Sequence, residues 1–357
     1  MKAKSNFFSQ LALNLAEVNL GKTKTNPSVG CVIVQNGSVI SSGITSVSGR
    51  PHAEFNALSK KKLFKNSDMY VSLEPCTHYG VTPPCTNIIK KKKIKNVYYT
   101  FNDPDHRTNN KAKIQLDKYK IKSKKINLDN SNLYQSYFLN IKHQIPYIDA
   151  KIAFSKDNLT INKKNEWITN HRSRKVGHLL RSRYDCIIST SKTINKDNSL
   201  LNCRISGLDN YKPDLIIIDR NFKLKKNLKM FKITNKRNTF IVTVKNDFKK
   251  ISYFKRKKIK IIQIDKLEEK EDFLKLLYKI YKKGKRRVLI ESGLSFINSF
   301  IKFKFIHNLY VFKSSKNLNI YGSNNSSLKL IKKFRTKDKL KVNLGDDQLF
   351  KVRLNNV

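Results

Sequence analysis

Acidic residues are scarce in this chain. Its 26 Asp and Glu residues stand against 74 Lys and Arg residues, which gives a formal net charge of +48. A field of this strength attracts nucleic acid, anionic lipid or phosphorylated small molecules. The lysines are spread over the whole chain and form no tail, a pattern that favours ordinary solvated surfaces. We therefore expect no specific nucleic-acid partner, only weak binding that weakens further in salt because it depends on counterion release.

Cysteine and long apolar runs are scarce as well. Five cysteines without regular spacing do not form a secreted disulfide framework. They indicate a reducing compartment, and we expect a cytoplasmic protein. No run approaches the roughly 18 apolar residues that a membrane span needs. Polar residues interrupt positions 1–20, so this segment is predicted to be a helix and not a signal peptide, and no membrane partner is expected.

One nucleotide-binding signature is missing too. No Gly-x-Gly-x-x-Gly follows a predicted strand, so a Rossmann dinucleotide site is not indicated. At 357 residues the chain is long enough for two domains of about 100–200 residues each. We place them at residues 1–145 and 146–357, with the join near Ile141–Pro146.

The first domain is predicted to have an α/β/α layer design. Phe7 to Val18 shows helical spacing, and Val29–Val34 is a β-branched strand that Asn36-Gly37 turns into a hairpin. A helix is expected to open at Pro51 with Phe55 and Leu58 on its inner face, which places His52 and Glu54 in its first turn. Further strands and helices alternate to about residue 141: Met69–Leu73, Cys85–Lys92, Val97–Phe101, Lys111–Tyr119, Ile121–Ile126 and Leu133–Ile141.

The second domain is predicted to be a mostly parallel sheet with helical crossovers. It begins at Tyr147–Phe154, which alternates in polarity. The remaining elements alternate between apolar strands and amphipathic helices. The strands are Cys186–Ser189, Leu215–Asp219, Phe240–Val244, Ile259–Ile264, Val288–Glu291 and Leu309–Phe312, and the helices are His171–Arg183, Glu268–Lys282 and Ser295–Lys302.

A set of metal-binding residue types marks the first domain. His52, Cys76 and Cys85 match the three protein ligands of a catalytic zinc site, whose fourth position is kept for water. Glu54 stands two residues after the histidine, close enough to move a proton without binding the metal. Zinc lowers the pKa of water and so provides hydroxide near neutral pH. His-x-Glu followed by Pro-Cys is the signature of zinc deaminases, and the alternative, a structural zinc site, would need a fourth protein ligand.

The spacing of the two cysteines narrows this prediction. Deaminases usually have Cys-x-x-Cys, whereas eight residues separate Cys76 from Cys85 here. The run Glu74–Cys85, with Asn26–Val34 upstream, resembles the deaminase half of the bifunctional deaminase–reductases of riboflavin biosynthesis. The resemblance implies a cytidine-deaminase-like α/β/α domain that removes the 2-amino group of a phosphorylated diaminopyrimidinone, with Asn26 holding the ring.

The same family resemblance extends into the second domain. Lys151-x-Ala153-x-Ser155-x-Asp157, Trp167-Ile168-Thr169 and Glu291-x-Gly293 follow the order of the family's reductase half. The resemblance implies a dihydrofolate-reductase-like α/β domain that uses NADPH to reduce the ribose to a ribityl chain. Asn158 and Asn198 depart from the family's usual Asp-Gly and Asp-Asp-Pro. By motif, Ala153, Trp167, Thr193, Asp197 and Gly293 would contact NADPH, and Asn165, Arg181, Leu201, Arg204 and Glu291 would contact the substrate.

Two other functions are compatible with parts of the sequence. The charge also suits a nucleic-acid-editing zinc deaminase with a basic accessory domain, although such an enzyme has no use for the reductase pattern. A basic RNA-binding protein on an inactive deaminase fold is the non-enzymatic alternative, and the intact set of His52, Glu54, Cys76 and Cys85 argues against it. A homo-oligomer is compatible with all three.

Overall fold

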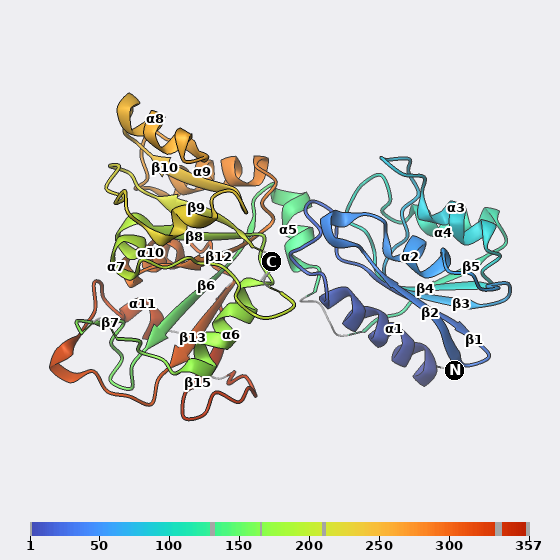
Figure 1. Cartoon of the computed structure of the whole chain (residues 1–357). Coiled ribbons are helices and arrows are strands. Elements are labelled where there is room, and N and C mark those ends of the chain that lie inside the picture. Colours follow the sequence, from blue (N-terminus) through green and yellow to red (C-terminus); the bar gives the residue numbers. More distant parts are fainter. Residues whose placement is uncertain (1, 129–132, 165, 209–211, 333–337, 355–357) are drawn as a thin grey trace. The chain divides into compact units, whose positions relative to one another are not determined.

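The computed structural model describes residues 2–128, 133–164, 166–208, 212–332 and 338–354. The chain divides into two compact units, Met1–Gln144 and Ile145–Val357 (Figure 1). The boundary expected from the sequence, between residues 145 and 146, lies one residue further along. No helix in the described ranges is both long enough and apolar enough to cross a bilayer.

The first unit is built on a five-stranded sheet with the order β2-β1-β3-β4-β5. The neighbours of β1 run antiparallel to it, whereas β3, β4 and β5 are mutually parallel. The strands are β1 (Gly30–Gln35), β2 (Ser38–Ile44), β3 (Asp68–Leu73), β4 (Asn96–Phe101) and β5 (Lys122–Lys125), and the helices are α1 (Lys2–Glu17), α2 (Ala53–Leu58), α3 (Cys85–Lys91), α4 (Lys111–Lys118) and α5 (Gln135–His143).

The β1–β2 hairpin sets the layers of this unit. Asn36 and Gly37 have φ values of 51° and 78°, the conformation of the predicted two-residue turn. A Cβ on Gly30 would lie 2.1 Å from the Ala12 carbonyl oxygen of α1, and one on Gly43 would lie 2.3 Å from the Ala53 carbonyl oxygen of α2. Gly43 pairs with Cys31, the residue after Gly30, so the two glycines face opposite sides of the sheet. Helices α1 and α2 therefore cover opposite faces, as Figure 1 shows.

Helix α2 differs from its predicted form. It begins at Ala53 and not at Pro51, and His52 is its N-cap residue. The expectation that Phe55 faces inward was wrong, because 48% of its surface is exposed, whereas Leu58 is fully buried as expected. The close approach at Gly43 leaves room only for small side chains on that face, so Ala53 and Ala57 occupy it.

The second unit contains an eight-stranded sheet in the order β11-β10-β9-β8-β12-β6-β13-β15. All neighbours are parallel except β13 and β15, which confirms the predicted parallel sheet with crossovers. The strands are β6 (Tyr147–Phe154), β8 (Cys186–Thr190), β9 (Asp214–Ile218), β10 (Thr239–Thr243), β11 (Ile259–Gln263), β12 (Arg287–Glu291), β13 (Asn308–Lys313) and β15 (Gln348–Arg353).

The helices of this unit include three that were not predicted. The expected helices appear as α6 (His171–Arg181), α9 (Lys270–Lys282) and α10 (Leu294–Lys302); the additional ones are α7 (Ser191–Asp197), α8 (Phe248–Arg256) and α11 (Lys329–Lys332). A short pair, β7 (Ile161–Asn162) and β14 (Gly322–Ser323), forms a separate two-stranded sheet.

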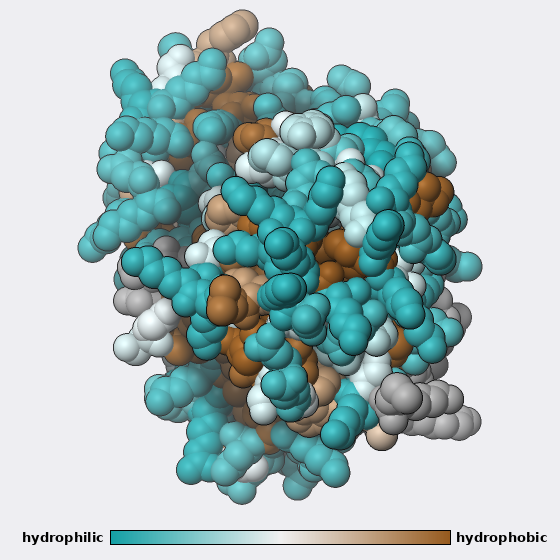
Figure 2. All heavy atoms as spheres, turned by 90° about the vertical axis from the view of Figure 1, so that its right-hand side faces the viewer, coloured by the Kyte–Doolittle hydropathy of each residue, from teal (hydrophilic) through white to brown (hydrophobic). Residues whose placement is uncertain are grey.

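Each unit has its own apolar core. Every residue of β9 and β10 is buried, as expected for central parallel strands covered by helices on both faces. The visible surface is mostly hydrophilic, with apolar side chains scattered between polar ones (Figure 2). On this face the distribution agrees with solvated lysines.

Candidate active sites

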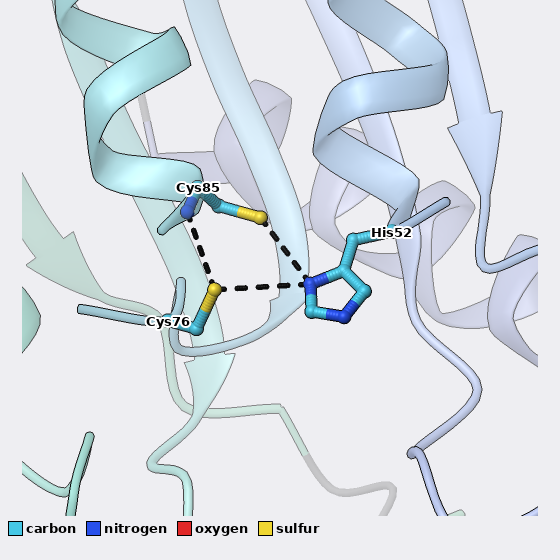
Figure 3. Close-up of side chains that lie close together, drawn as sticks. All are labelled: His52, Cys76 and Cys85. Atoms are coloured by element: carbon cyan, nitrogen blue, oxygen red, sulfur yellow. Dashed lines mark hydrogen bonds between the residues drawn. The ribbon is translucent and has the colours of Figure 1, made fainter. Parts of the chain in front are cut away.

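The three predicted zinc ligands converge in the first unit (Figure 3). His52 caps α2, Cys76 lies in the loop after β3, and Cys85 is the first residue of α3. The His52 Nδ1 atom lies 3.7 Å from Cys76 Sγ and 3.4 Å from Cys85 Sγ. Donors bound to one tetrahedral zinc ion stand roughly 3.5 Å apart. This donor set therefore fits zinc, and among the described residues it includes no fourth protein ligand.

The two thiols do not ionise alike. The backbone N–H of Cys85 donates to Cys76 Sγ over 3.2 Å. Hydrogen bonds from the Cys85 and His52 side chains, with this N–H, lower the pKa of Cys76 to about 4 despite burial. The pKa of Cys85 is raised, because its side chain donates to Cys76 and lies buried. The surroundings therefore favour ionisation of Cys76 and not of Cys85.

Glu54 is the buried carboxyl group of this site. It lies in the first turn of α2 and is only 4% exposed. Burial raises its pKa to about 7, and the negative charge of Cys76 adds to the rise. A cation among the three ligands would act against this rise. Its oxygens are not among the metal-binding atoms, although Glu54 is hydrogen-bonded to Cys85, so the carboxyl group can take up and release a proton beside the metal site.

Asn26 lies beside the loop that leads to His52. Its Nδ2 donates to the Gly49 carbonyl oxygen over 2.8 Å. Gly49 has a φ of 94°, and a Cβ there would come within 2.5 Å of the Thr23 carbonyl oxygen. No partner is found for Asn26 Oδ1 within the described residues, which leaves that oxygen available to accept a hydrogen bond from a ring amino group.

Glu74 has a role that the sequence reasoning missed. This buried carboxylate accepts backbone N–H groups from Asp103, Asn110 and Ala112 at 3.0–3.2 Å. It therefore holds the segment after β4 against the segment after β3, where Cys76 lies. Its position at the end of an apolar strand, next to Pro75-Cys76, was the available signal.

The second unit brings Arg181 and Glu291 together. Arg181 Nε and Nη2 donate to the two oxygens of Glu291 over 2.5 and 2.9 Å, and Nη1 donates to the Asn202 carbonyl oxygen. Burial would raise the pKa of Glu291, but the charge and hydrogen bonds of Arg181 bring it below its usual value. Because Arg181 uses these donors within the protein, it acts first as the fixed partner of Glu291.

Lys151 joins this pair and was not among the predicted site residues. It is the cross-strand neighbour of Glu291 between β6 and β12. Burial lowers the pKa of its ammonium group, while the charges of Glu291 and Asp197 oppose the change. A lysine with a lowered pKa beside a buried carboxylate is suited to donate a proton.

A cluster of hydroxyl groups lies at the same carboxyl edge of the sheet. Thr190 Oγ1 is 3.0 Å from Thr193 Oγ1 and 3.2 Å from Ser292 Oγ. Gly293 follows, and a Cβ there would lie 2.8 Å from Asn325 Nδ2. Asn325 Oδ1 also accepts the backbone N–H of Ser295, so one N–H group at the start of α10 is already bonded within the protein.

The other predicted residues of this unit have different environments. Trp167 is 65% exposed, with Arg174 stacked 5.1 Å from its ring, so it does not belong to the core. Ala153 lies half-buried on β6, and Arg204 is exposed and donates to Asn202 Oδ1. The side chain of Leu201 is buried in an apolar cluster. Asn165 lies outside the described residues.

The two departures from the family pattern suit their backbone positions. Asn158 and Asn198 have φ values of 63° and 43°, and Asn198 ends α7 in the left-handed conformation. Asparagine adopts this conformation more readily than most residues. Both substitutions are therefore compatible with the fold at these turns.

These observations define a zinc-dependent deaminase domain followed by a reductase domain. Residues 2–101 match the cytidine and deoxycytidylate deaminase zinc-binding region, and residues 146–318 match the RibD C-terminal domain. The cofactors expected from the sequence, Zn²⁺ and NADPH, are those of these two kinds of domain.

Whole-chain relatives identify the family. The chain is 30% identical to the riboflavin biosynthesis protein RibD of Aquifex aeolicus, over 87% of this chain and 86% of that protein. It is 29% identical to RibD of Buchnera aphidicola, over 88% of each chain. The chain belongs to the RibD family, the bifunctional deaminase–reductases of riboflavin biosynthesis, and the editing alternative is not favoured. Acinetobacter baumannii RibD has the same fold, with a TM-score of 0.85 at 24% identity over 100% of both chains.

Proposed function

We propose that residues 1–145 deaminate 2,5-diamino-6-ribosylamino-4(3H)-pyrimidinone 5′-phosphate and that residues 146–357 reduce the product. The product is 5-amino-6-(5-phosphoribosylamino)uracil, whose ribose becomes a ribityl chain. This substrate pair is supported by the name of a Thermotoga maritima protein with the same fold, a diaminohydroxyphosphoribosylaminopyrimidine deaminase/5-amino-6-(5-phosphoribosylamino)uracil reductase, which is 22% identical over 99% of both chains with a TM-score of 0.83. It is also supported by the groups that each unit brings together: the three metal ligands with Glu54 in the first, and Glu291 with Arg181 and Lys151 in the second.

In the first site, His52, Cys76 and Cys85 would hold zinc. Zinc would act as a Lewis acid and lower the pKa of bound water. Glu54 accepts the proton of the attacking water and delivers it to the amino group that leaves as ammonia. Its burial, which favours the protonated form, and its place beside the ligand Cys85 suit both halves of that transfer. Asn26 orients the ring through its free Oδ1.

In the second site, NADPH supplies the hydride. Glu291, fixed by Arg181, orients the sugar, and Lys151 donates the proton that completes the reduction. Five residues are proposed to contact NADPH. Thr193 and Gly293 closely follow strands β8 and β12, and Asp197 ends α7. Ala153 lies on β6, and Trp167 lies between β7 and α6. Leu201, through its backbone, Arg204 and Asn165 are proposed to contact the substrate, with the exposed Arg204 facing its phosphate.

One observation supports the proposal most strongly: three metal-ligand atoms lie within 4.8 Å of one another, and the buried carboxyl group of Glu54, which is not one of them, is hydrogen-bonded to Cys85. The test is to offer the purified chain the diaminopyrimidinone phosphate with and without NADPH and to read the products by mass. Deamination changes the mass by about one unit and reduction by about two. Absence of both products would contradict the proposal.

A cytoplasmic location follows from the same proposal. All five cysteines are free thiols, and the zinc ligands among them need a reducing compartment to remain so. The proposed partner is the phosphorylated pyrimidine, with no specific nucleic acid. A homo-oligomer is compatible with this function and would be measured by the mass of the protein in solution.

A further inference from the structure

An arginine stands next to the metal site without an acidic partner. Arg50 precedes His52 by two residues, so their Cα atoms are no more than about 7 Å apart. Its Nη1 donates to the Thr82 hydroxyl over 2.8 Å, which ties the guanidinium to the loop between Cys76 and Cys85. In the described ranges, Arg50 forms no ion pair, and its Nε and Nη2 donate to no other group.

The other arginine near this loop is different. Arg107 is connected to the loop through its carbonyl oxygen, which accepts from Thr77. Its guanidinium pairs with Asp105 over 2.5 Å, so a carboxylate already compensates its charge. Arg50 therefore keeps donors and a charge that the protein does not satisfy.

A histidine faces Arg50 across a glycine. A Cβ on Gly80 would lie 3.8 Å from Arg50 Nη2 and 3.9 Å from His78 Nε2. The Nδ1 atom of His78 is 3.1 Å from the Thr108 hydroxyl. When that hydroxyl donates to Nδ1, Nε2 bears the hydrogen and can donate in turn. Arg50 Nη2 and His78 Nε2 therefore lie on either side of the space that a side chain at position 80 would occupy, and glycine leaves this space open.

We propose that Arg50, assisted by His78, binds the phosphate group of the deaminase substrate and selects phosphorylated over dephosphorylated pyrimidines. The proposal rests on the proposed function of this domain. The planar, positively charged guanidinium can bind two phosphate oxygens at once. The general positive field attracts anions to the whole surface, whereas Arg50 places one contact close to the zinc ligands.

The test compares deamination of the diaminopyrimidinone ribosyl 5′-phosphate with that of the same compound without phosphate. Arg50→Gln should lower kcat/KM for the phosphorylated compound by about 10- to 100-fold, the usual worth of charge-assisted hydrogen bonds, and leave the other compound within about 2-fold. Arg50→Lys should fall between, because it keeps the charge and loses the planar fork. Inorganic phosphate should inhibit the wild type competitively and Arg50→Gln more weakly.

Lys65→Gln is the matched control, since it removes one exposed charge at the opposite end of β3. It should leave kcat/KM unchanged for both the phosphorylated and the dephosphorylated compound. Zinc content should remain equal in all variants. Equal losses on both compounds, or a loss explained by missing zinc, would overturn the assignment of Arg50. Failure of the wild type to deaminate either compound would instead refute the proposed function.

Discussion

The two active sites differ in how they balance charge. The first gathers two thiols and the buried Glu54 around one histidine, and burial together with the thiolate of Cys76 raises the pKa of Glu54. The second contains its own cations, because Arg181 and Lys151 surround Glu291 and bring its pKa below the usual value. The first set of groups is therefore balanced only when a metal cation joins it, whereas the second is balanced by its own residues.

Replacing Glu54 should have the largest effect and should act on the first site alone. Glu54→Gln keeps the three ligands and removes the proton carrier, so deamination should fall by about 10²–10⁴-fold while the zinc content stays constant. Metal analysis and product mass measure the two quantities. Glu17→Gln, an exposed residue at the end of α1, serves as control. Loss of zinc from Glu54→Gln would show that Glu54 is a ligand.

Glu291→Ala tests whether the charges of the second site are balanced by its own residues. It leaves Arg181 buried without its partner, and breaking such a pair costs about 3–5 kcal/mol. Reduction should be lost while deamination persists. Hydrogen exchange of the backbone amides of β9 and β10, which are buried in the second domain, reports the unfolding of that domain. Lys266→Ala, which breaks an exposed pair with Glu269, should cost less than about 1 kcal/mol. Equal stability of the two variants would contradict the buried ion pair.

The pH dependence should show a smaller effect in the second domain. Burial, followed by the charge of Arg181, lowers the pKa of His178 to about 4 from 6.5. A group whose pKa falls on folding stabilises the fold above its unfolded value, and that stability is lost as pH drops. Between pH 6.5 and 4 the loss should be about 1–2 kcal/mol, reduced because the ring is partly exposed. The difference in the free energy of unfolding between the wild type and His178→Gln should show this slope, because groups that titrate with the opposite sign, such as the buried Asp185, are common to both proteins.

The contrast between the sites also explains what the sequence could predict. The zinc ligands and Glu54 lie within residues 52–85, where a local motif determines the chemistry. Lys151 and Glu291 are 140 positions apart and become neighbours only through the pairing of β6 with β12. Strands and long helices followed from apolar patterns, whereas the exposure of Phe55 depended on the close contact at Gly43. The use of Arg181 within the protein, and the Asn325 contact at the start of α10, likewise depend on tertiary packing.

The central claim is that each domain contains a complete and chemically independent site. The most direct measurement uses Cys76→Ser and follows two reactions: deamination of the diaminopyrimidinone phosphate, and NADPH oxidation with the already deaminated compound. We expect deamination to fall by at least about 10³-fold with loss of zinc, because one thiolate ligand of the metal is removed. NADPH oxidation should stay within about 3-fold of the wild type, since its groups lie in residues 146–357. Parallel loss of both reactions in a protein whose β9 and β10 amides stay protected from hydrogen exchange, as in a folded second domain, would contradict the claim.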